Sequence, residues 1–233
     1  MKLLKEYISN ILIKEDIHKK PGFSLDKAKN ITDKDELWIY LNEYLQSLGR
    51  GSSREAFLYS SKKIIKIALN NAGLGQNEAE VDFYTNPKLK PLSTKIYDYD
   101  KNNLWIISEL VRPISKEEFH QVFGIDFESF MDLAYLVLKG TNKKEDIEFS
   151  SQKTNHFFNM LIDNIVVGQL CFGDIQVIDH WGKSTTGDIV MLDYGFNREV
   201  QCKYYKRNVN ISKIKLIPTS TLILKSDEAT KVA

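Results

Sequence analysis

Cysteine and histidine are both scarce in this chain. Its 233 residues include two cysteines and four histidines. Two cysteines cannot form the disulfide framework of a small secreted domain, so a reducing compartment is expected. The histidines lack the spacing of zinc ligands, and Cys171 and Cys202 are isolated from each other. A zinc site is therefore not predicted.

The chain also lacks long apolar runs and a surplus of charge. No apolar run approaches the length that spans a bilayer, and Lys5, Glu6 and Lys14 interrupt the apolar core that a signal peptide needs. The net charge of +1 gives no overall attraction to nucleic acid or to an anionic membrane. With 42% hydrophobic and 27% charged residues, the composition is that of a soluble globular protein. We expect a cytoplasmic protein with no membrane segment and no nucleic-acid partner.

Residues 1–45 are predicted to form a helical extension. Between residues 2 and 14, apolar residues recur at helical spacing. A second helix is predicted from Thr32 to Leu45, because Thr32 and Asp33 suit the N-terminus of a helix. The first helix either packs on the chain's own domain or docks on a partner protein.

Residues 46–111 are predicted to contain five antiparallel strands and one helix. The first two strands form a hairpin whose loop begins around Gly49 and Gly51 and continues through Ser52 and Ser53. Such a loop can place backbone N–H groups around phosphate oxygens. An ordinary glycine-containing hairpin would also explain these residues.

The third strand, over residues 64–68, carries a single lysine, Lys66, inside an apolar run. A lysine in such a place either reaches the surface with its ammonium group or pairs with an acid. A helix is predicted over residues 76–84, and apolar residues flank its Glu80. Glu80 and Glu78 could each be an exposed surface residue.

Residues 112–233 are predicted to be mainly helical. Ser115, Asp126 and Thr154 are each expected to begin a helix, because their side chains can accept hydrogen bonds from the first free amides. After Asn197 we expect one or two edge strands or an extended arm.

Two aspartates end apolar stretches in this second part of the chain. Asp193 follows a short apolar strand that a turn at Gly187 connects to the strand before it, and Asp174 ends an earlier apolar stretch. A buried strand that ends on a carboxylate is costly unless the charge has a partner. A magnesium ion carried by phosphates would be such a partner, so the two aspartates are expected to meet at one site.

The chain resembles protein-kinase-fold enzymes in the order of three short motifs: Gly173-Asp174, Asp179-His180 and Asp193-Tyr194-Gly195. In that family a catalytic loop, H-R-D-x-x-x-x-N, precedes a metal-binding D-F-G turn. The motif sequences are most similar to those of small kinase-like proteins carried by bacteriophages, and the resemblance extends over about residues 46–197. It implies an α+β, two-lobed protein-kinase-like fold. Two N-terminal helices would precede a five-stranded antiparallel small lobe over residues 46–111 and a reduced, mainly helical large lobe with a C-terminal arm over residues 112–233.

The resemblance also implies a catalytic role for three residues and two metal ligands. Lys66 would hold the phosphates of ATP, and an acid on the next helix would pair with it and orient it, with Glu80 as first candidate and Glu78 as second. Asp174 would orient or deprotonate the accepting hydroxyl group. Asp193 would bind magnesium, and Asp179 stands where the second metal ligand of the family is found.

The remaining implied residues contact the nucleotide. Its phosphates would lie under the glycine-rich loop, and its adenine edge would meet backbone groups at the end of the fifth strand. The residues assigned to these contacts are Gly49, Gly51, Ser52, Ser53, Glu109 and Val111.

The chain departs from the family at three places. Arg54 stands at the third glycine of the loop, Cys171-Phe172-Gly173 replaces the His-Arg half of the catalytic loop, and few residues follow Gly195. Two functions are therefore predicted. One is an ATP- and magnesium-dependent phosphotransferase acting on a hydroxyl of a protein or small molecule in a host cytoplasm. The alternative is a catalytically degraded binding or structural module, associated with a phage particle, whose N-terminal helix contacts a phage or host protein.

Overall fold

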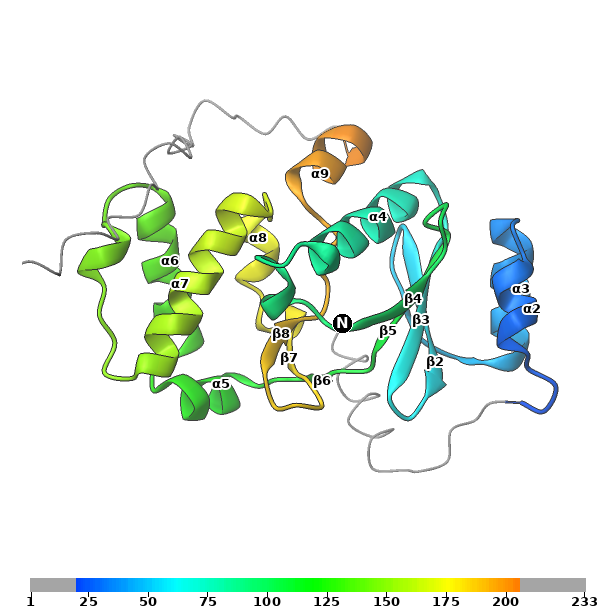
Figure 1. The fold of residues 1–233 in the computed structure, drawn as a ribbon, viewed down its shortest axis with the longest axis horizontal. Helices are drawn as coiled ribbons and strands as arrows, with labels where there is room; N and C mark the ends of the chain where they lie inside the picture. The colour runs from blue at the N-terminus through cyan, green and yellow to red at the C-terminus, as the bar shows by residue number, and fades with distance from the viewer. Residues whose placement is uncertain (1–19, 206–233) are drawn as a thin grey trace, which may run out of the picture.

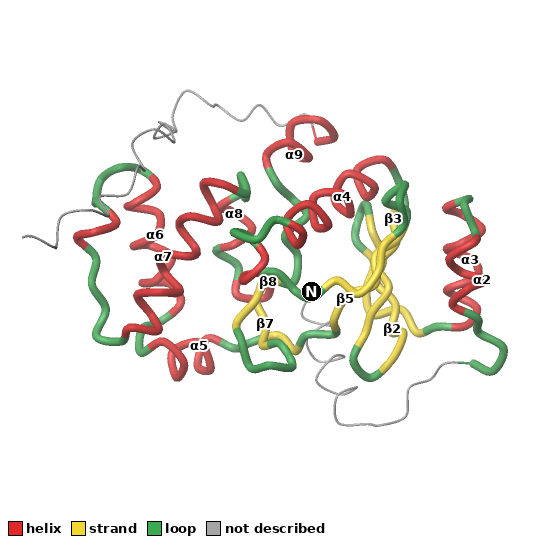
Figure 2. Tube along the Cα trace, viewed as in Figure 1, coloured by secondary structure: helices red, strands yellow, loops and turns green. Residues whose placement is uncertain are grey.

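In the computed structural model, residues 20–205 are described, and the helix predicted between residues 2 and 14 lies outside them. The described chain begins with two helices, continues through a sheet, and ends in a mainly helical region (Figure 1). Figure 2 shows the strands of the first half gathered in one sheet, with helices at both of its faces. The predicted α+β architecture is confirmed.

The first two helices are α2 (Leu25–Asn30) and α3 (Lys34–Tyr44). The helix predicted from Thr32 begins slightly later, because the side chain of Asp33 caps α3 by accepting hydrogen bonds from two backbone amides. Helix α2 was not predicted. Both helices pack their apolar side on the sheet, where Leu37 and Leu41 join one buried cluster with Phe57 and Ile65.

The predicted five-stranded antiparallel sheet is confirmed. Its strands lie in the order β1-β2-β3-β5-β4, so the third strand is central. Neighbouring strands pair antiparallel throughout. The strands are β1 (Gln46–Arg50), β2 (Arg54–Ser60), β3 (Lys63–Ala68), β4 (Ile96–Tyr99) and β5 (Trp105–Glu109).

Helix α4 (Asn71–Thr85) connects β3 to β4 and packs on the other face of the sheet, where Val81 contacts Ile106 and Ile96. It is longer than the predicted helix, because the side chain of Asn70 caps it well before residue 76. Gly73 and Gly75 weaken the helical pattern in the first turns of α4, so its start was not predicted. A Cβ at Gly73 would lie 2.1 Å from the Ser53 carbonyl oxygen, so glycine is required for the close approach of α4 to the β1–β2 loop. A short 3-10 turn, η1 (Lys90–Leu92), follows α4.

The helical region contains α5 (Lys116–Phe123), α6 (Phe127–Leu138) and α7 (Gln152–Val167), with a 3-10 turn η2 (Lys144–Asp146) between the last two. Ser115 and Asp126 begin α5 and α6 as predicted. The prediction for Thr154 was wrong, because α7 starts after Ser151. Thr154 lies inside the helix, where its buried hydroxyl donates to the Phe123 carbonyl at 2.8 Å.

A small second sheet joins the two parts of the chain. It consists of β6 (Arg112–Pro113), β7 (Trp181–Lys183) and β8 (Ile189–Met191), in that order. The predicted turn at Gly187 is present, with a φ of 90° that favours glycine. Two short helices precede β7. They are α8 (Phe172–Ile175), which contains Asp174, and the 3-10 helix η3 (Ile178–His180).

Helix α9 (Arg198–Tyr205) follows the Asp193-Tyr194-Gly195 turn. The expected edge strand or arm is therefore wrong for these residues, and the rest of that prediction lies outside the described part. Helix α9 lies along α4 (Figure 1), and the approach is so close that a Cβ at Gly75 would lie 2.5 Å from the Tyr204 ring. Within residues 20–205, no helix is both long and apolar enough to span a membrane.

Candidate functional site

Lys66 in β3 and Glu80 in α4 form a buried ion pair. The ammonium nitrogen of Lys66 lies 3.0 Å and 2.9 Å from the two carboxylate oxygens of Glu80. It also donates to the Leu192 carbonyl at 2.9 Å. The two residues are 8% and 0% exposed, whereas Glu78 is on the surface. A pair buried this deeply costs desolvation energy, so its presence points to a use other than stability.

Arg54, the residue at the third-glycine position, joins this pair to Asp193. One terminal nitrogen of its guanidinium donates to Glu80 at 2.7 Å and to Asn77 at 3.3 Å, and the other donates to Asp193 at 2.5 Å. Burial alone would lower the pKa of Arg54, but the carboxylates of Glu80 and Asp193 raise it above its ordinary value. We call Arg54, Lys66, Glu80 and Asp193 the charged cluster.

Asp193 stands at the end of β8, and its side chain is 51% exposed. Its crowded surroundings alone would raise its pKa, but the nearby charges of Arg54 and Lys66 outweigh them and lower the pKa below its ordinary value. The carboxylate is therefore ionised at neutral pH. It is the most exposed member of the charged cluster.

The turn after Asp193 is fixed against α4. The buried ring of Tyr194 packs on Phe83 with ring centroids 5.0 Å apart, and its hydroxyl donates to the Thr94 carbonyl at 3.1 Å. A Cβ at Gly195 would lie 2.4 Å from the Gln76 carbonyl oxygen, so glycine is required there too. These contacts hold Asp193 next to the side chains of α4.

Asp174 lies in α8, and its backbone carbonyl is linked to the charged cluster by a series of hydrogen bonds. A ring nitrogen of His180 lies 2.8 Å from the Asp174 carbonyl oxygen. The His180 carbonyl accepts from the Leu192 amide at 2.8 Å, and the Leu192 carbonyl accepts from Lys66. The structure thus connects Asp174 to Lys66 through two intervening residues, although the two are far apart in sequence.

The predicted magnesium site does not fit these side chains as they stand. Arg54 holds the carboxylate of Asp193, which magnesium would need. Asp179 lies in η3, and within residues 20–205 no three histidine, cysteine, aspartate or glutamate side chains gather in an arrangement that could hold a metal ion. Asp193 instead accepts a hydrogen bond from Arg54, and the positive charge of Lys66 acts on it from nearby.

The residues predicted to contact phosphates lie at the β1–β2 loop. Gly49, Gly51 and Ser52 are exposed there, and the Gly51 amide donates to the Arg54 carbonyl at 2.8 Å, which closes the loop. Ser53 is buried. Its hydroxyl donates to Gln76 at 2.9 Å and accepts from Tyr205 at 3.2 Å, so it is used to tie the loop to α4 and α9.

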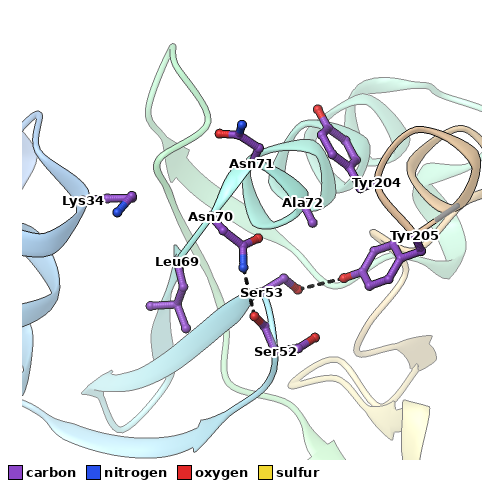
Figure 3. Close-up of a pocket in the computed structure, with 9 residues that line it drawn as sticks. All are labelled: Lys34, Ser52, Ser53, Leu69, Asn70, Asn71, Ala72, Tyr204 and Tyr205. Carbon is purple, nitrogen blue, oxygen red and sulfur yellow. Dashed lines mark hydrogen bonds between the residues drawn. The ribbon is translucent and has the colours of Figure 1, made fainter.

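A cavity of about 570 Å³ lies beside this loop, between the start of α4 and α9 (Figure 3). It contains two of the predicted phosphate-binding residues but no member of the charged cluster, so the cavity and the cluster are separate features. Its lining residues are Lys34, Ser52, Ser53, Leu69, Asn70, Asn71, Ala72, Tyr204 and Tyr205.

Glu109 and Val111, predicted to meet an adenine edge, lie at the end of β5 and are buried. The Glu109 amide donates to the Lys95 carbonyl at 2.8 Å. The Glu109 carboxylate accepts from the amide and hydroxyl of Thr185 at 2.7 Å and 2.6 Å, which ties β5 to the β7–β8 turn. This side-chain contact was not predicted.

Ser108 lies on the same face of the sheet as Lys66. Strand pairing sets Ile106 opposite Lys66 and Ser108 opposite Ile64, and alternate residues of a strand share a face. Its hydroxyl is buried and has no hydrogen-bond partner among the described residues. A small apolar cluster adjoins it, made of Leu48, Ala56, Leu58, Ile64 and Leu110.

The contacts of three further residues were also missed from the sequence. Arg54 was noted only as a departure from a glycine pattern, although a charged residue opening a strand could have been examined as a partner for Glu80. Asn77 and Tyr205 gave no local signal, because their partners lie in distant segments.

Comparison with known proteins adds a distant similarity. No protein-family model and no curated protein matches the sequence. A solved structure that matches is the ternary complex of streptomycin, ATP and APH(2'')-IIa, an aminoglycoside phosphotransferase, with 13% identity, 71% of each chain covered and a TM-score of 0.36. A similarity this low carries no function over to the present chain, which has to be argued from the contacts above.

Proposed function

We propose that the chain binds a nucleoside triphosphate, ATP, at the charged cluster and transfers its terminal phosphoryl group to a hydroxyl of a small molecule or protein. The observation that carries this proposal is the buried Lys66–Glu80 pair joined to Asp193. Phosphoryl transfer needs little covalent help from a protein and depends on positioning and charge neutralisation. A cluster that keeps two cations at a fixed place supplies both.

The roles of the cluster residues follow from their contacts. Lys66 would bind phosphate oxygens while Glu80 holds its ammonium group in place. The accepting hydroxyl oxygen would attack the terminal phosphorus as the bond to the leaving diphosphate breaks, and Asp174 would take the hydroxyl proton. Asp193 could serve as a magnesium ligand only if Arg54 left that carboxylate.

The base of the nucleotide would lie on the sheet face that carries Lys66. The ring would pack against the apolar cluster beside Ser108. The buried Ser108 hydroxyl has no hydrogen-bond partner among the described residues, and a base could supply one. Because the Glu109 amide is already bonded to Lys95, the base edge would meet the Glu109 carbonyl and the Val111 backbone.

A second candidate is a nucleotide-regulated binding module without catalysis. The contact between Arg54 and Asp193 favours it, because this contact occupies a carboxylate that a kinase would use for metal. The segment Cys171-Phe172-Gly173, which replaces the His-Arg half of the catalytic loop, points in the same direction.

The test combines binding and transfer. A ligand that binds only the native state at a hundred times its Kd should stabilise it by about 2.7 kcal/mol, seen as a rise in the unfolding temperature. We expect this rise with ATP in the wild type and in Lys62→Met, an exposed-lysine control, and its loss in Lys66→Met. A wild-type protein that saturating ATP does not stabilise would refute both candidates.

Transfer separates the two candidates. Asp174→Asn should keep ATP binding but lose release of radiolabelled phosphate from γ-labelled ATP if the chain is a phosphotransferase. Because the acceptor is unknown, the assay uses slow transfer to water as its readout. Wild-type protein that binds ATP but does not exceed Asp174→Asn in this assay would favour the binding module.

A further inference from the structure

Arg54 occupies the place between the glycine-rich loop and the Asp193 turn. It opens β2, and its carbonyl closes the loop by accepting from Gly51. Its side chain is 10% exposed and reaches from the sheet to a carboxylate 139 positions later in the chain. The residue therefore fastens the first half of the molecule to the second at the proposed phosphate site.

The two acid contacts of Arg54 depend on each other. One terminal nitrogen binds Glu80 and the other binds Asp193, and both belong to one planar guanidinium. Because the group is rigid, it cannot turn away from Asp193 without disturbing its bond to Glu80. Asn77 accepts a further hydrogen bond from the nitrogen that binds Glu80. Arg54 is thus built into the site and is not a loose surface arginine.

The charges of the cluster balance as they stand. Lys66 and Arg54 are positive, and Glu80 and Asp193 are negative, each with a partner at hydrogen-bond distance. A divalent cation on Asp193 would lie next to the guanidinium of Arg54, and like charges this close repel strongly where little water separates them. Metal binding would therefore require the Arg54 contacts to break.

We propose, on the premise of the function above, that Arg54 stays on Asp193 when nucleotide binds and supplies the positive charge expected of magnesium. The chain then binds a nucleoside triphosphate without a divalent metal. The three contacts of Arg54 leave further N–H groups of its guanidinium to bind phosphate oxygens, and arginine binds phosphate in this forked manner.

The first test measures the Kd of the full chain for ATP by calorimetric titration, once in excess EDTA and once in excess magnesium chloride. The proposal predicts two values that differ by less than about twofold. Binding that weakens by about tenfold or more in EDTA overturns it, while leaving the proposed nucleotide function in place. Absence of binding under both conditions refutes the proposed function and this inference together.

Substitution of Arg54 provides the second test. In Arg54→Gln, which keeps a polar side chain but removes the charge, Asp193 is free for metal. We expect metal-free ATP binding to weaken by about tenfold or more and magnesium to restore it. Arg50→Gln is the matched control, because Arg50 is an arginine of the neighbouring strand with a 55% exposed side chain, and its binding should match the wild type.

A third variant guards against misfolding. Arg54→Lys keeps the positive charge but cannot bridge Glu80 and Asp193 in the same forked way. We expect metal-independent binding that is weaker than in the wild type and stronger than in Arg54→Gln. If both Arg54 variants bind ATP in EDTA as tightly as the wild type does, the charge of Arg54 plays no part in binding and the proposal is wrong.

Discussion

The helical region and the sheet region of this molecule bury different kinds of side chain. The core of the helical region is apolar and rich in aromatic rings, with Phe130 in contact with Phe119, Phe123, Phe157 and Phe158. The sheet region adds to its apolar cores a set of buried or half-buried charges. An apolar core is stabilised by its own packing, whereas burying charged side chains costs desolvation free energy.

This difference indicates where stability and function reside. Apolar burial stabilises a fold by about 25 cal/mol for each Å² removed from water. A buried ion pair often stabilises no more than apolar residues of the same shape would, because desolvation offsets the attraction. We infer that the helical core holds the fold and that the charged cluster is kept for the ligand it binds.

The largest effect on stability is expected in the helical core. Phe130→Ala removes a fully buried ring and should lower the free energy of unfolding by about 3–5 kcal/mol. Urea denaturation measures this loss, with Val167→Ala, an exposed apolar residue, as control. Where the variant is folded, its Kd for ATP should equal that of the wild type. An altered Kd would mean that the two regions are not independent.

The next largest effect is expected in the charged cluster. Glu80→Gln leaves Lys66 and Arg54 without their shared carboxylate and should lower the free energy of unfolding by about 3 kcal/mol. Unlike Phe130→Ala, it should also abolish ATP binding. Glu78→Gln, on the exposed side of the same helix, is the matched control. Equal stability of the two glutamine variants would show that the buried pair costs nothing to break.

The smallest effect is expected for an ion pair near the surface. Arg112 donates two hydrogen bonds to Glu118, at 2.9 Å and 2.5 Å, and these bonds are the main reason that the pKa of Glu118 lies below its ordinary value. Both side chains are partly exposed, so Glu118→Gln should cost less than about 1 kcal/mol at neutral pH. Glutamine can still complete the capping box at Ser115, so the loss is confined to the pair with Arg112.

The pH dependence of the stability of Glu118→Gln tests whether the loss comes from the charge of Glu118. Because the pKa of Glu118 is depressed in the folded state, its contribution is present above the unfolded pKa, about 4.3, and disappears as the pH falls through the folded value. The stability difference between wild type and Glu118→Gln should therefore vanish in acid. A difference that stays constant from neutral to acid pH would point to packing. Glu145→Gln, an exposed glutamate, is the control.

The features that could be predicted from the sequence are those that depend on residues close together in the chain. A lysine inside an apolar strand either reaches the surface or pairs with an acid, and the following helix contains Glu80 among apolar residues. The helix caps at Ser115 and Asp126 depend on backbone amides a few residues away, and they were predicted correctly. The prediction that Thr154 begins a helix was wrong, because its hydroxyl donates a hydrogen bond to a carbonyl of another helix.

The contacts that were missed join segments that lie far apart in the chain. Arg54 and Asp193 meet only because β2 and the end of β8 are brought together by packing, and no local pattern records that meeting. The early start of α4 was hidden by Gly73 and Gly75, which weaken a helical pattern but are required by close neighbours. Helix α9 was hidden in the same way, since its packing on α4 is a tertiary effect.

The most direct measurement is a crystal structure of the full chain grown with ATP. The account predicts phosphate oxygens within hydrogen-bond distance of the Lys66 ammonium and the Arg54 guanidinium, with Arg54 still on Asp193. A nucleotide found instead in the cavity lined by Ser52 and Tyr205, with no phosphate near Lys66, would contradict it.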